Sequence, residues 1–244
     1  MIRFEHVKFF RNDRVILKDI SFSIGLDERV AIVGGSGEGK TTILKLILRL
    51  LEPDQGKIII DDEDVTSLKE SHLKNMRRKF SIVFQDGALF DSLNVKENVA
   101  YYLREFSKLS EPQIDEKVKQ LLNLVGIENA EEMMPEELSG GMQRRVAIAR
   151  SLAMHEPKMF LYDEPTSDLD PMSAAKITNV IKELAKAGSG FIMVTHEISD
   201  ALKTAQRFMF LKNGFLQFDG SREEFLNSKN SELNEFLLDW KNQS

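Results

Sequence analysis

Two short glycine-containing stretches in this chain have the composition and spacing to bind phosphate groups. The first, Gly34-Gly35-Ser36-Gly37-Glu38-Gly39-Lys40-Thr41, matches G-x-x-x-x-G-K-[ST] at every fixed position. The second, Leu138-Ser139-Gly140-Gly141-Met142-Gln143, opens a helical run about 100 residues later. The start of a helix carries unpaired N–H groups and a partial positive charge, and both favour an anion. Two phosphate-binding stretches beside a single nucleotide motif predict that two copies of the chain share their sites.

The first stretch has the neighbours that a nucleotide-binding loop requires. The apolar run 29–33 before it predicts a buried strand, and residues 41–48 after it have helical spacing. In this context the glycines let backbone amides surround the phosphates, Lys40 reaches the β- and γ-phosphates, and the Thr41 hydroxyl binds Mg²⁺. We also expect Thr42 to contact the nucleotide. The alternative, a glycine-rich turn with a chance lysine, does not explain the full spacing together with both flanks.

A pair of carboxylates, Asp163 and Glu164, ends the apolar run 159–162. If that strand ends beside the phosphate loop, Asp163 can hold Mg²⁺, directly or through water. Glu164 can then act as general base toward the attacking water, a role that contributes roughly 10²- to 10⁴-fold. The alternative is a solvated acidic turn. The continuation 165–170 and the distance along the chain from Lys40 favour the catalytic interpretation.

Two further polar residues follow apolar runs of the same kind. His196 comes after the run 191–195, and we interpret it as a sensor of the γ-phosphate that also holds the attacking water. Gln85 ends the run 80–84 and could contact Mg²⁺ or water at the junction with the helical segment that follows. Most histidines and glutamines at strand ends are structural, so both interpretations depend on position.

Composition limits the classes of protein to which the chain can belong. Its 244 residues suit one large domain, or one domain with an insertion, and 42% of them are apolar. The net charge of −6 argues against nucleic acid as the main ligand. The absence of cysteine excludes disulfides, thiol catalysis and cysteine-ligated zinc. No signal peptide and no apolar run of about 20 residues is present, so we expect an intracellular chain that does not itself cross a membrane.

Strand-like segments alternate with helical patterns along most of the chain, as in an α/β fold with buried parallel strands. The expected strands are 2–7, 21–24, 29–33, 57–60, 80–84, 159–162, 191–195, 208–211 and 214–218. Between residue 86 and about residue 154 helical stretches replace the strands, around 95–106, 111–125 and 139–153. This predicts a helical subdomain inserted into an α/β core. Residues from 221 onward predict one or two short helices that pack on the chain's own core.

The order of these motifs resembles that of the nucleotide-binding subunit of an ABC (ATP-binding cassette) transporter. The shared order is the phosphate loop at 34–41, Gln85, the second stretch at 138–143, Asp163 with Glu164, the loop 167–170, and His196. The resemblance implies an α/β P-loop NTPase (RecA-like) core of ABC type, with an N-terminal antiparallel β subdomain and an inserted helical subdomain. It places the ATP-binding domain at 1–220, the helical insertion at 86–154 and a short helical tail at 221–244.

The same resemblance implies how the two phosphate-binding stretches are used. In the family, two subunits pair head-to-tail, and the phosphate loop of one and the second stretch of the other enclose one ATP. The residues of the second stretch that would contact the partner's nucleotide are Ser139, Gly140, Gly141 and Gln143. Asp170 and its neighbours would cross the interface and couple the two sites.

The expected adenine contact departs from the family's pattern. The family usually places an aromatic residue about two dozen positions before the phosphate loop, to stack on adenine. That place here falls on Arg11, with Phe9 and Phe10 beside it. A guanidinium can stack on a purine, so Arg11 is the expected contact and either phenylalanine is the alternative.

The stretches 84–101 and 133–142 closely resemble those of the ATPases of bacterial phospholipid-trafficking transporters, the Mla (maintenance of lipid asymmetry) and related MCE systems. The likeness includes Gly87-Ala88-Leu89-Phe90, Met142 and a tail pair, Phe236-Leu237, which in that family reaches the other ATPase subunit. It implies integral-membrane permease subunits, an MCE-domain lipid-binding protein and a small accessory subunit as partners. It also implies a location on the cytoplasmic side of the bacterial inner membrane.

Two other functions remain open at this point. The chain could serve another importer or exporter, for amino acids, lipoproteins or drugs, with identical catalytic residues. It could also be a non-transport ABC ATPase, such as one that serves iron–sulfur cluster assembly. Residues 88–90 would suit a contact with a helix of the permease if they are exposed, and would belong to the core of the helical subdomain if they are not.

Overall fold

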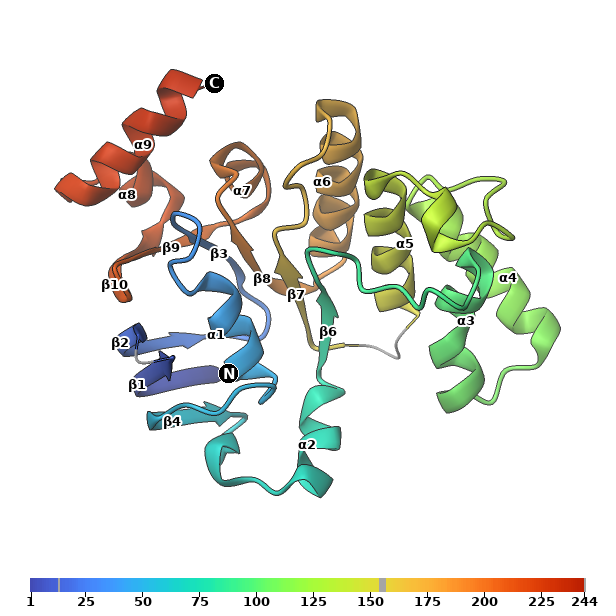
Figure 1. Ribbon diagram of the computed structural model, residues 1–244, viewed down its shortest axis with the longest axis horizontal. Coiled ribbons are helices and arrows are strands. Elements are labelled where there is room, and N and C mark those ends of the chain that lie inside the picture. The colour runs from blue at the N-terminus through green and yellow to red at the C-terminus, as the bar shows by residue number, and fades with distance from the viewer. Residues whose placement is uncertain (13, 154–156, 244) are drawn as a thin grey trace.

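A six-stranded sheet forms the centre of the computed structural model, which describes residues 1–12, 14–153 and 157–243 (Figure 1). Its strands lie in the order β10-β9-β3-β8-β7-β6. They are β3 (Arg29–Val33), β6 (Phe80–Val83), β7 (Met159–Asp163), β8 (Gly190–Thr195), β9 (Arg207–Lys212) and β10 (Phe215–Ser221). Neighbouring strands are parallel except for β9 and β10, which are antiparallel.

Each face of this sheet has its own apolar core. Because successive side chains of a strand point to opposite faces, Ala31 and Val33 of β3 belong to one core and Val30 and Ile32 to the other. The second core also holds the buried face of α1 (Lys40–Ile47) and of the antiparallel sheet. Parallel strands covered on both faces carry near-continuous apolar runs, which explains why the sequence revealed them.

A second, antiparallel sheet lies beside α1, in the strand order β2-β1-β4-β5. Its strands are β1 (Ile2–Arg11), β2 (Arg14–Ile24), β4 (Gln55–Ile60) and β5 (Glu63–Asp64). The first two are longer than the sequence pattern indicated. Their pairing shifts register near His6 and Asp19, which have φ of 52° and 89°. Such bulges break the alternation of apolar and polar residues by which a strand is recognised.

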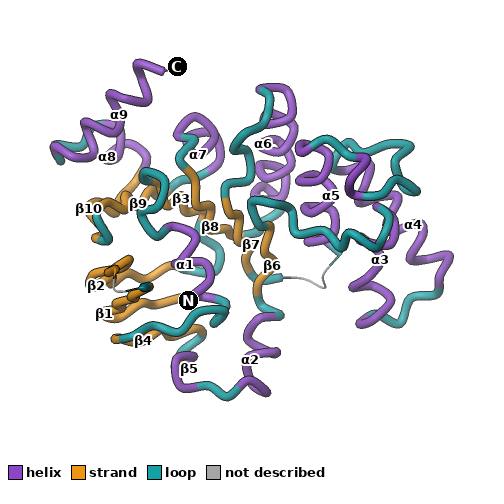
Figure 2. The backbone as a smooth tube through the Cα atoms, in the orientation of Figure 1, coloured by secondary structure: helices purple, strands orange, loops and turns teal. Residues whose placement is uncertain are grey.

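Three helices connect β6 to β7 and pack on one another at the end of the molecule remote from the antiparallel sheet (Figures 1 and 2). They are α3 (Val95–Phe106), α4 (Glu111–Leu124) and α5 (Gly140–Leu152), within one residue at each end of the predicted helices. Asn94 with Glu97 and Ser110 with Gln113 form capping boxes at the starts of α3 and α4. The expected α/β fold with an antiparallel N-terminal sheet is confirmed.

The remaining helices complete the two faces of the central sheet. They are α2 (Glu70–Arg77), α6 (Pro171–Lys186), α7 (Ile198–Thr204), α8 (Arg222–Leu226) and α9 (Ser231–Gln243), with 3-10 turns at Val65–Ser67 and Pro135–Glu137. Among the described residues, no helix combines the length and apolar character needed to cross a membrane. Residues 154 and 244, the expected ends of the helical insertion and of the tail, lie outside the described residues.

The C-terminal tail folds back on the chain's own core, as expected from the sequence. Phe225 of α8 stacks on Phe208 and Phe236 of α9 stacks on Phe210, with ring centroids 4.6 and 5.1 Å apart. Leu237 is 3% exposed. The Phe236-Leu237 pair, which the family resemblance directed toward a second ATPase subunit, therefore packs within this chain.

Asp61 ties the antiparallel sheet to the central sheet. It lies in the turn between β4 and β5, and its Oδ2 accepts hydrogen bonds from Lys79 (2.9 Å) and Lys158 (3.1 Å), which precede β6 and β7. Its Oδ1 accepts one from the amino group of Met1 at 3.0 Å. The Lys79 hydrogen bond is the main reason that the pKa of Asp61 lies well below its usual range.

We predict that Asp61→Asn lowers the free energy of unfolding by about 1 kcal/mol at pH 7, because the lysines lose their anionic partner. The folded-state pKa is below the unfolded value of about 3.9, so the stabilisation is present above that pH and is lost as the pH falls below it. Urea unfolding at pH 7, 4 and 3 should show wild type and variant converging. Asn retains the left-handed backbone of this position, where φ is 50°.

The matched control is Asp62→Asn, the same substitution at the exposed next residue of the turn, where φ is 64°. It should change stability by less than about 0.5 kcal/mol. A difference between wild type and Asp61→Asn that stays constant from pH 7 to pH 3 would contradict the assignment.

Candidate functional site

The carboxyl ends of β3, β8 and β7 meet at one edge of the central sheet. β8 lies between the other two, with Val33 of β3 level with Thr195 of β8, and Asp163 of β7 level with Val194 of β8. The loop 34–39, Glu164 and His196 directly follow these strands and are therefore brought together. This is the edge at which open α/β sheets bind their ligands.

The loop 34–39 connects β3 to the first turn of α1 (Figure 1). Gly39 caps α1 with φ of 99°, and a Cβ there would lie 2.9 Å from Leu17 Cδ2, so the position requires glycine. Within the described part of the chain, no side chain caps this helix start, and no acidic residue lies in its first turn. The first N–H groups of α1 are therefore available to an anion. Thr42 lies half-buried in the same turn.

Lys40 is the first residue of α1, its side chain reaches back into this loop, and it is 5% exposed. Its Nζ donates to the carbonyl oxygens of Gly34 (2.9 Å) and Gly35 (3.0 Å) and lies 3.3 Å from Glu164 Oε1. The loop thus folds around a buried cation whose partners are two backbone dipoles and one carboxylate. A cation held in this way attracts the negative charge of a bound phosphate group.

Thr41 and Asp163 face each other across the same edge. The Thr41 hydroxyl donates to Asp163 Oδ1 at 2.7 Å. Burial raises the pKa of Asp163, and the hydrogen bond from Thr41 acts in the opposite direction. A hydroxyl and a carboxylate at this spacing are the hard oxygen donors that Mg²⁺ prefers, and Mg²⁺ needs only one or two protein ligands beside substrate phosphates. The pair therefore fits a phosphate-bound Mg²⁺.

Glu164 and His196 form the second half of the site. Glu164 is 7% exposed, its backbone takes the left-handed conformation (φ 47°), and its N–H donates to Val194 O at 2.9 Å. Its Oε2 accepts a hydrogen bond from the His196 N–H at 3.2 Å and lies 2.9 Å from His196 Nδ1. The carboxylate is thus fixed between a lysine and a histidine, and such a carboxylate can accept a proton from water.

The second glycine-containing stretch belongs to a different part of the fold. It begins α5, which packs against β6 and α3, and two further strands separate β6 from β3. Ser139 caps the helix by accepting from Met142 N at 3.3 Å, and Ser139 and Gly140 are exposed. Gln143 differs from its neighbours, because its amide donates to Pro135 O at 2.8 Å and holds the loop before the helix.

The three candidates for the adenine contact all lie on β1 but differ in how exposed they are. Phe9 is 8% exposed and belongs to the apolar core, so its ring is not free to stack on a base. Phe10 is 39% exposed, and Arg11 is exposed at the end of β1. The hairpin lies near the phosphate loop, because the Cβ position of Gly39 is 3.0 Å from Ile16 Cγ2 of β2.

Gln85 is the second residue after β6 and is exposed. Its backbone carbonyl accepts a hydrogen bond of 3.0 Å from Arg144 Nε, a contact that the sequence analysis missed. Arg144 also donates to the carbonyls of Glu164 and Ser167. The sequence did contain one indication of this contact. Arg144 directly follows the second glycine-containing stretch, on a helix whose later positions are largely apolar, so a buried arginine could be expected there.

Comparisons with known proteins agree with this geometry. The protein-family model for ABC transporters matches residues 17–167. The chain is 36% identical to the intermembrane phospholipid transport system ATP-binding protein MlaF of Escherichia coli K12, over 97% of this chain and 88% of MlaF. It is 39% identical to the arginine transport ATP-binding protein ArtM of Bacillus subtilis, over 97% of this chain and 98% of ArtM.

A solved structure has the same fold. It is the dimeric, post-hydrolysis state of an ATP-binding cassette bound to ADP and phosphate, with a TM-score of 0.83 and 32% identity over 91% of this chain and 98% of the other. The motif order, the edge at which the motifs meet and these likenesses lead to one conclusion. The chain belongs to the ABC transporter family and is an ATP-binding subunit that couples ATP hydrolysis to transport.

Proposed function

We propose that this chain is the ATPase subunit of a transporter that moves phospholipids between membranes. It works as a head-to-tail homodimer, bound to integral-membrane permease subunits on the cytoplasmic side of a bacterial inner membrane. An MCE-domain lipid-binding protein and a small accessory subunit complete the assembly. The observation that carries the substrate class is the likeness to MlaF, which extends over 97% of this chain.

The phosphate loop binds the nucleotide in this proposal. Its members are Gly34, Gly35, Ser36, Gly37, Glu38, Gly39, Lys40, Thr41 and Thr42. The N–H groups at the start of α1 and the ammonium of Lys40 hold the phosphates, and exposed Arg11 stacks on adenine. Thr41 and Asp163, with exposed Gln85 at the same edge, would hold Mg²⁺, which when bound neutralises charge on the phosphates.

Glu164 acts as the general base. Its carboxylate is fixed by the His196 backbone N–H and lies beside His196 Nδ1, so the two side chains can orient one water molecule between them and the γ-phosphate. Glu164 accepts the proton of that water as the water attacks the phosphorus. His196 contacts the γ-phosphate from the exposed side of the same edge. Lys40 stabilises the negative charge that develops on the phosphate oxygens.

The second glycine-containing stretch completes the site of a partner copy. Ser139 and Gly140 are exposed, and they belong to a helix that is not part of this chain's own phosphate site. Together with Gly141 they present the start of α5 to the partner's γ-phosphate, and Gln143 holds the preceding loop in place. The dimeric state of the related solved cassette supports this arrangement.

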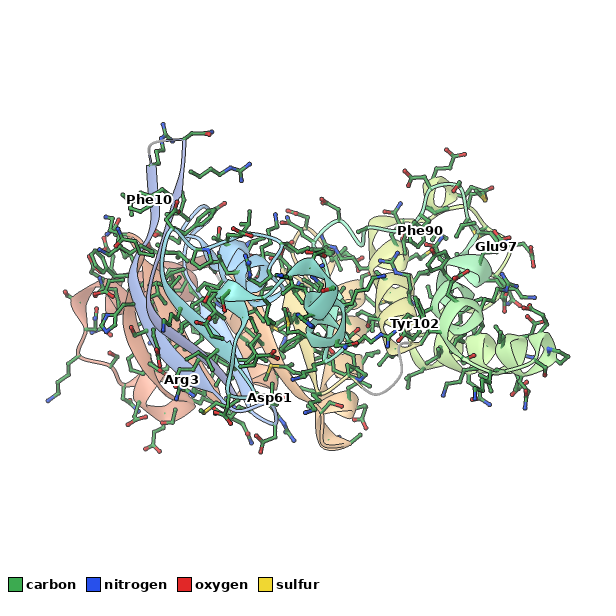
Figure 3. All side chains as sticks on the ribbon, turned by 90° about the horizontal axis from the view of Figure 1, so that it is seen from below. Arg3, Phe10, Asp61, Phe90, Glu97 and Tyr102 are labelled. Atoms are coloured by element: carbon green, nitrogen blue, oxygen red, sulfur yellow. The ribbon has the colours of Figure 1, made fainter. Side chains whose placement is uncertain are left out.

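An apolar groove of about 450 Å³ provides a docking surface for the permease. It lies between the core strand β6 and the helices α3 and α5, and its walls include Leu50, Phe84, Ala88, Phe90 and Tyr101. Phe90 is 43% exposed and its ring lies 4.9 Å from that of Tyr101. Figure 3 shows Phe90 at the helical end of the molecule, far from Phe10 and Arg3 of the antiparallel sheet. A short amphipathic helix fits such a groove.

One buried side chain holds the loop that forms a wall of this groove. Asn98 is fully buried; its Oδ1 accepts from Phe90 N at 2.8 Å, and its Nδ2 donates to Leu93 O at 2.8 Å and Phe90 O at 3.1 Å. Asn98 therefore holds residues 90–94, and Arg150 holds Gly87 and Ala88 through their carbonyls. Permease subunits differ between substrates, whereas the ATP site does not, so this contact surface is where substrate class can appear in an ATPase subunit. The Mla-like stretch 87–90 lies there.

The division of the chain follows from the same proposal. Residues 1–220 form the ATP-binding domain, in which 86–154 is the helical subdomain inserted between β6 and β7, and 221–244 form the tail. α8 and α9 of the tail stabilise the core through β9.

Glu164→Gln should reduce the rate of ATP turnover roughly 10²-fold or more, because an amide cannot accept the proton of the attacking water. ATP binding should remain, and ATP should trap a stable dimer visible by size-exclusion chromatography with light scattering. The control Glu197→Gln changes the neighbouring carboxylate, which lies 3.6 Å from His196 Nε2, and should keep most of the turnover. Wild-type turnover in Glu164→Gln would refute the assigned base.

Two substitutions, Gly140→Ala and Gly141→Ala, distinguish a contact with the partner copy from packing within the chain. A Cβ at Gly140 meets nothing within 4 Å, whereas one at Gly141 would lie 2.9 Å from Ser173 Oγ. Gly140→Ala should therefore keep the thermal midpoint, helped by the higher helix propensity of alanine, but lose most ATP hydrolysis and ATP-driven dimerisation. Gly141→Ala should lower the midpoint. If Gly140→Ala hydrolyses ATP and dimerises like wild type, the head-to-tail arrangement is wrong.

The complex with its permease, reconstituted in liposomes, should transfer fluorescent phospholipid when ATP is supplied and should not accumulate labelled arginine or glutamine. Phe90→Asp should reduce co-purification of the permease at least tenfold, because a charge enters the apolar groove. Phe215→Asp on β10, equally exposed at 43%, is the matched control and should leave co-purification unchanged. ATP-driven amino-acid uptake without lipid transfer would replace phospholipid with amino acid as the substrate class.

A further inference from the structure

Arg144 lies where three functional segments meet. It is the fifth residue of α5, one turn after the exposed start of that helix, and is 9% exposed. Its Nε donates to Gln85 O at 3.0 Å, and its Nη1 donates to the carbonyls of Glu164 (3.4 Å) and Ser167. One guanidinium therefore holds both the loop after β6 and the loop after β7.

All three acceptors are backbone carbonyls, so the contact fixes where the two loops run. A guanidinium is planar and presents its donors in a rigid fork, and this keeps the two loops at one spacing and one orientation. A lysine ammonium offers a single point and cannot bridge them in the same way. Burial lowers the pKa of Arg144, and the nearby carboxylates of Asp168, Asp86 and Glu164 act in the opposite direction.

The carbonyl of Glu164 gives this contact a consequence for catalysis. Glu164 is in the left-handed conformation, and its N–H donates to Val194 O of β8. Its carbonyl accepts from Arg144 Nη1 of α5 (3.4 Å) and from Ser167 Oγ (3.2 Å), and Arg144 also donates to the Ser167 carbonyl. The peptide groups on either side of Cα determine where the side chain starts. A shift of α5 therefore moves the Glu164 carboxylate relative to Lys40 and His196, its neighbours at 3.3 and 2.9 Å.

We propose that Arg144 is a positioning residue that transmits the placement of the start of α5 to the Glu164 carboxylate. The start of α5 reaches its working position only when it is docked on a nucleotide. Arg144 then sets Glu164, through its carbonyl, at the distance required for proton transfer. Hydrolysis is thereby made dependent on docking of α5. The inference rests on the proposed role of Glu164 and adds the link between that residue and α5.

Arg144→Lys tests the link in the chain bound to its permease. We expect kcat for ATP hydrolysis to fall at least tenfold, with KM for ATP and the affinity for a fluorescent ATP analogue changed less than threefold. The control is Arg49→Lys. Arg49 is 8% exposed and its guanidinium likewise bridges two carbonyls, of Val65 (2.8 Å) and Thr66 (3.1 Å), away from the sheet edge that carries the ATP site. Its kcat should stay within twofold of wild type.

Both lysine variants should lower the thermal midpoint by a similar, small amount, because each loses a bridge between carbonyls. A merely structural Arg144 would lower the midpoint and kcat and raise KM together, or would leave kcat at the wild-type value, and either result overturns the inference. Should Arg144→Lys fail to fold, Arg144→Gln, which keeps one amide donor, is measured in the same way.

Glu164→Gln measured alongside separates this inference from the proposed function. Loss of turnover in Glu164→Gln together with wild-type kcat in Arg144→Lys overturns the positioning role alone. Retained turnover in Glu164→Gln overturns the proposed base, and the positioning role falls with it.

Discussion

The buried ion pair between Lys40 and Glu164 is the contact on which the catalytic edge depends. Lys40 is 5% exposed and Glu164 is 7% exposed, and their charged atoms lie 3.3 Å apart. Charges removed from water in this way are costly unless each has a partner. Lys40 comes from the segment after β3 and Glu164 from the segment after β7, so the pair requires β8 between them, with the strand ends level.

The two apolar cores hold the strands at that register. On one face, α1 is enclosed between the central and antiparallel sheets, so the helix whose start forms the phosphate loop is packed on both sides. On the other face, α5, α6 and α7 cover the sheet. The polar residues of the site thus lie at the end of the strands, between two rigid apolar layers. A small shift of one layer against the other changes the positions of the residues at this edge, because close-packed interiors transmit strain.

α5 is the element that can carry such a shift between distant surfaces. Its first residues are exposed for a partner, and Arg144 reaches the loops after β6 and β7. At the other end, Arg150 donates to the carbonyls of Gly87 and Ala88 and lies over the ring of Phe90, in the wall of the apolar groove proposed as the docking surface. One helix therefore combines an exposed start, a hydrogen bond to the backbone carbonyl of Glu164 and a part of the groove wall.

The sequence by itself determined the fold class, the parallel strands and the three helices between β6 and β7, because buried strands and capped helices leave local patterns. It also identified Lys40 and Thr41 by the spacing G-x-x-x-x-G-K-[ST], and Asp163, Glu164 and His196 because they follow apolar runs. Only the tertiary structure decided which of them touch, that Phe9 is buried while Arg11 is exposed, and that Gln143 holds its own loop. Arg144 escaped the sequence analysis because its acceptors are backbone carbonyls 59, 20 and 23 residues away, and a carbonyl is the same at every position. The bulges at His6 and Asp19 escaped it because strand pairing, not local pattern, imposes them.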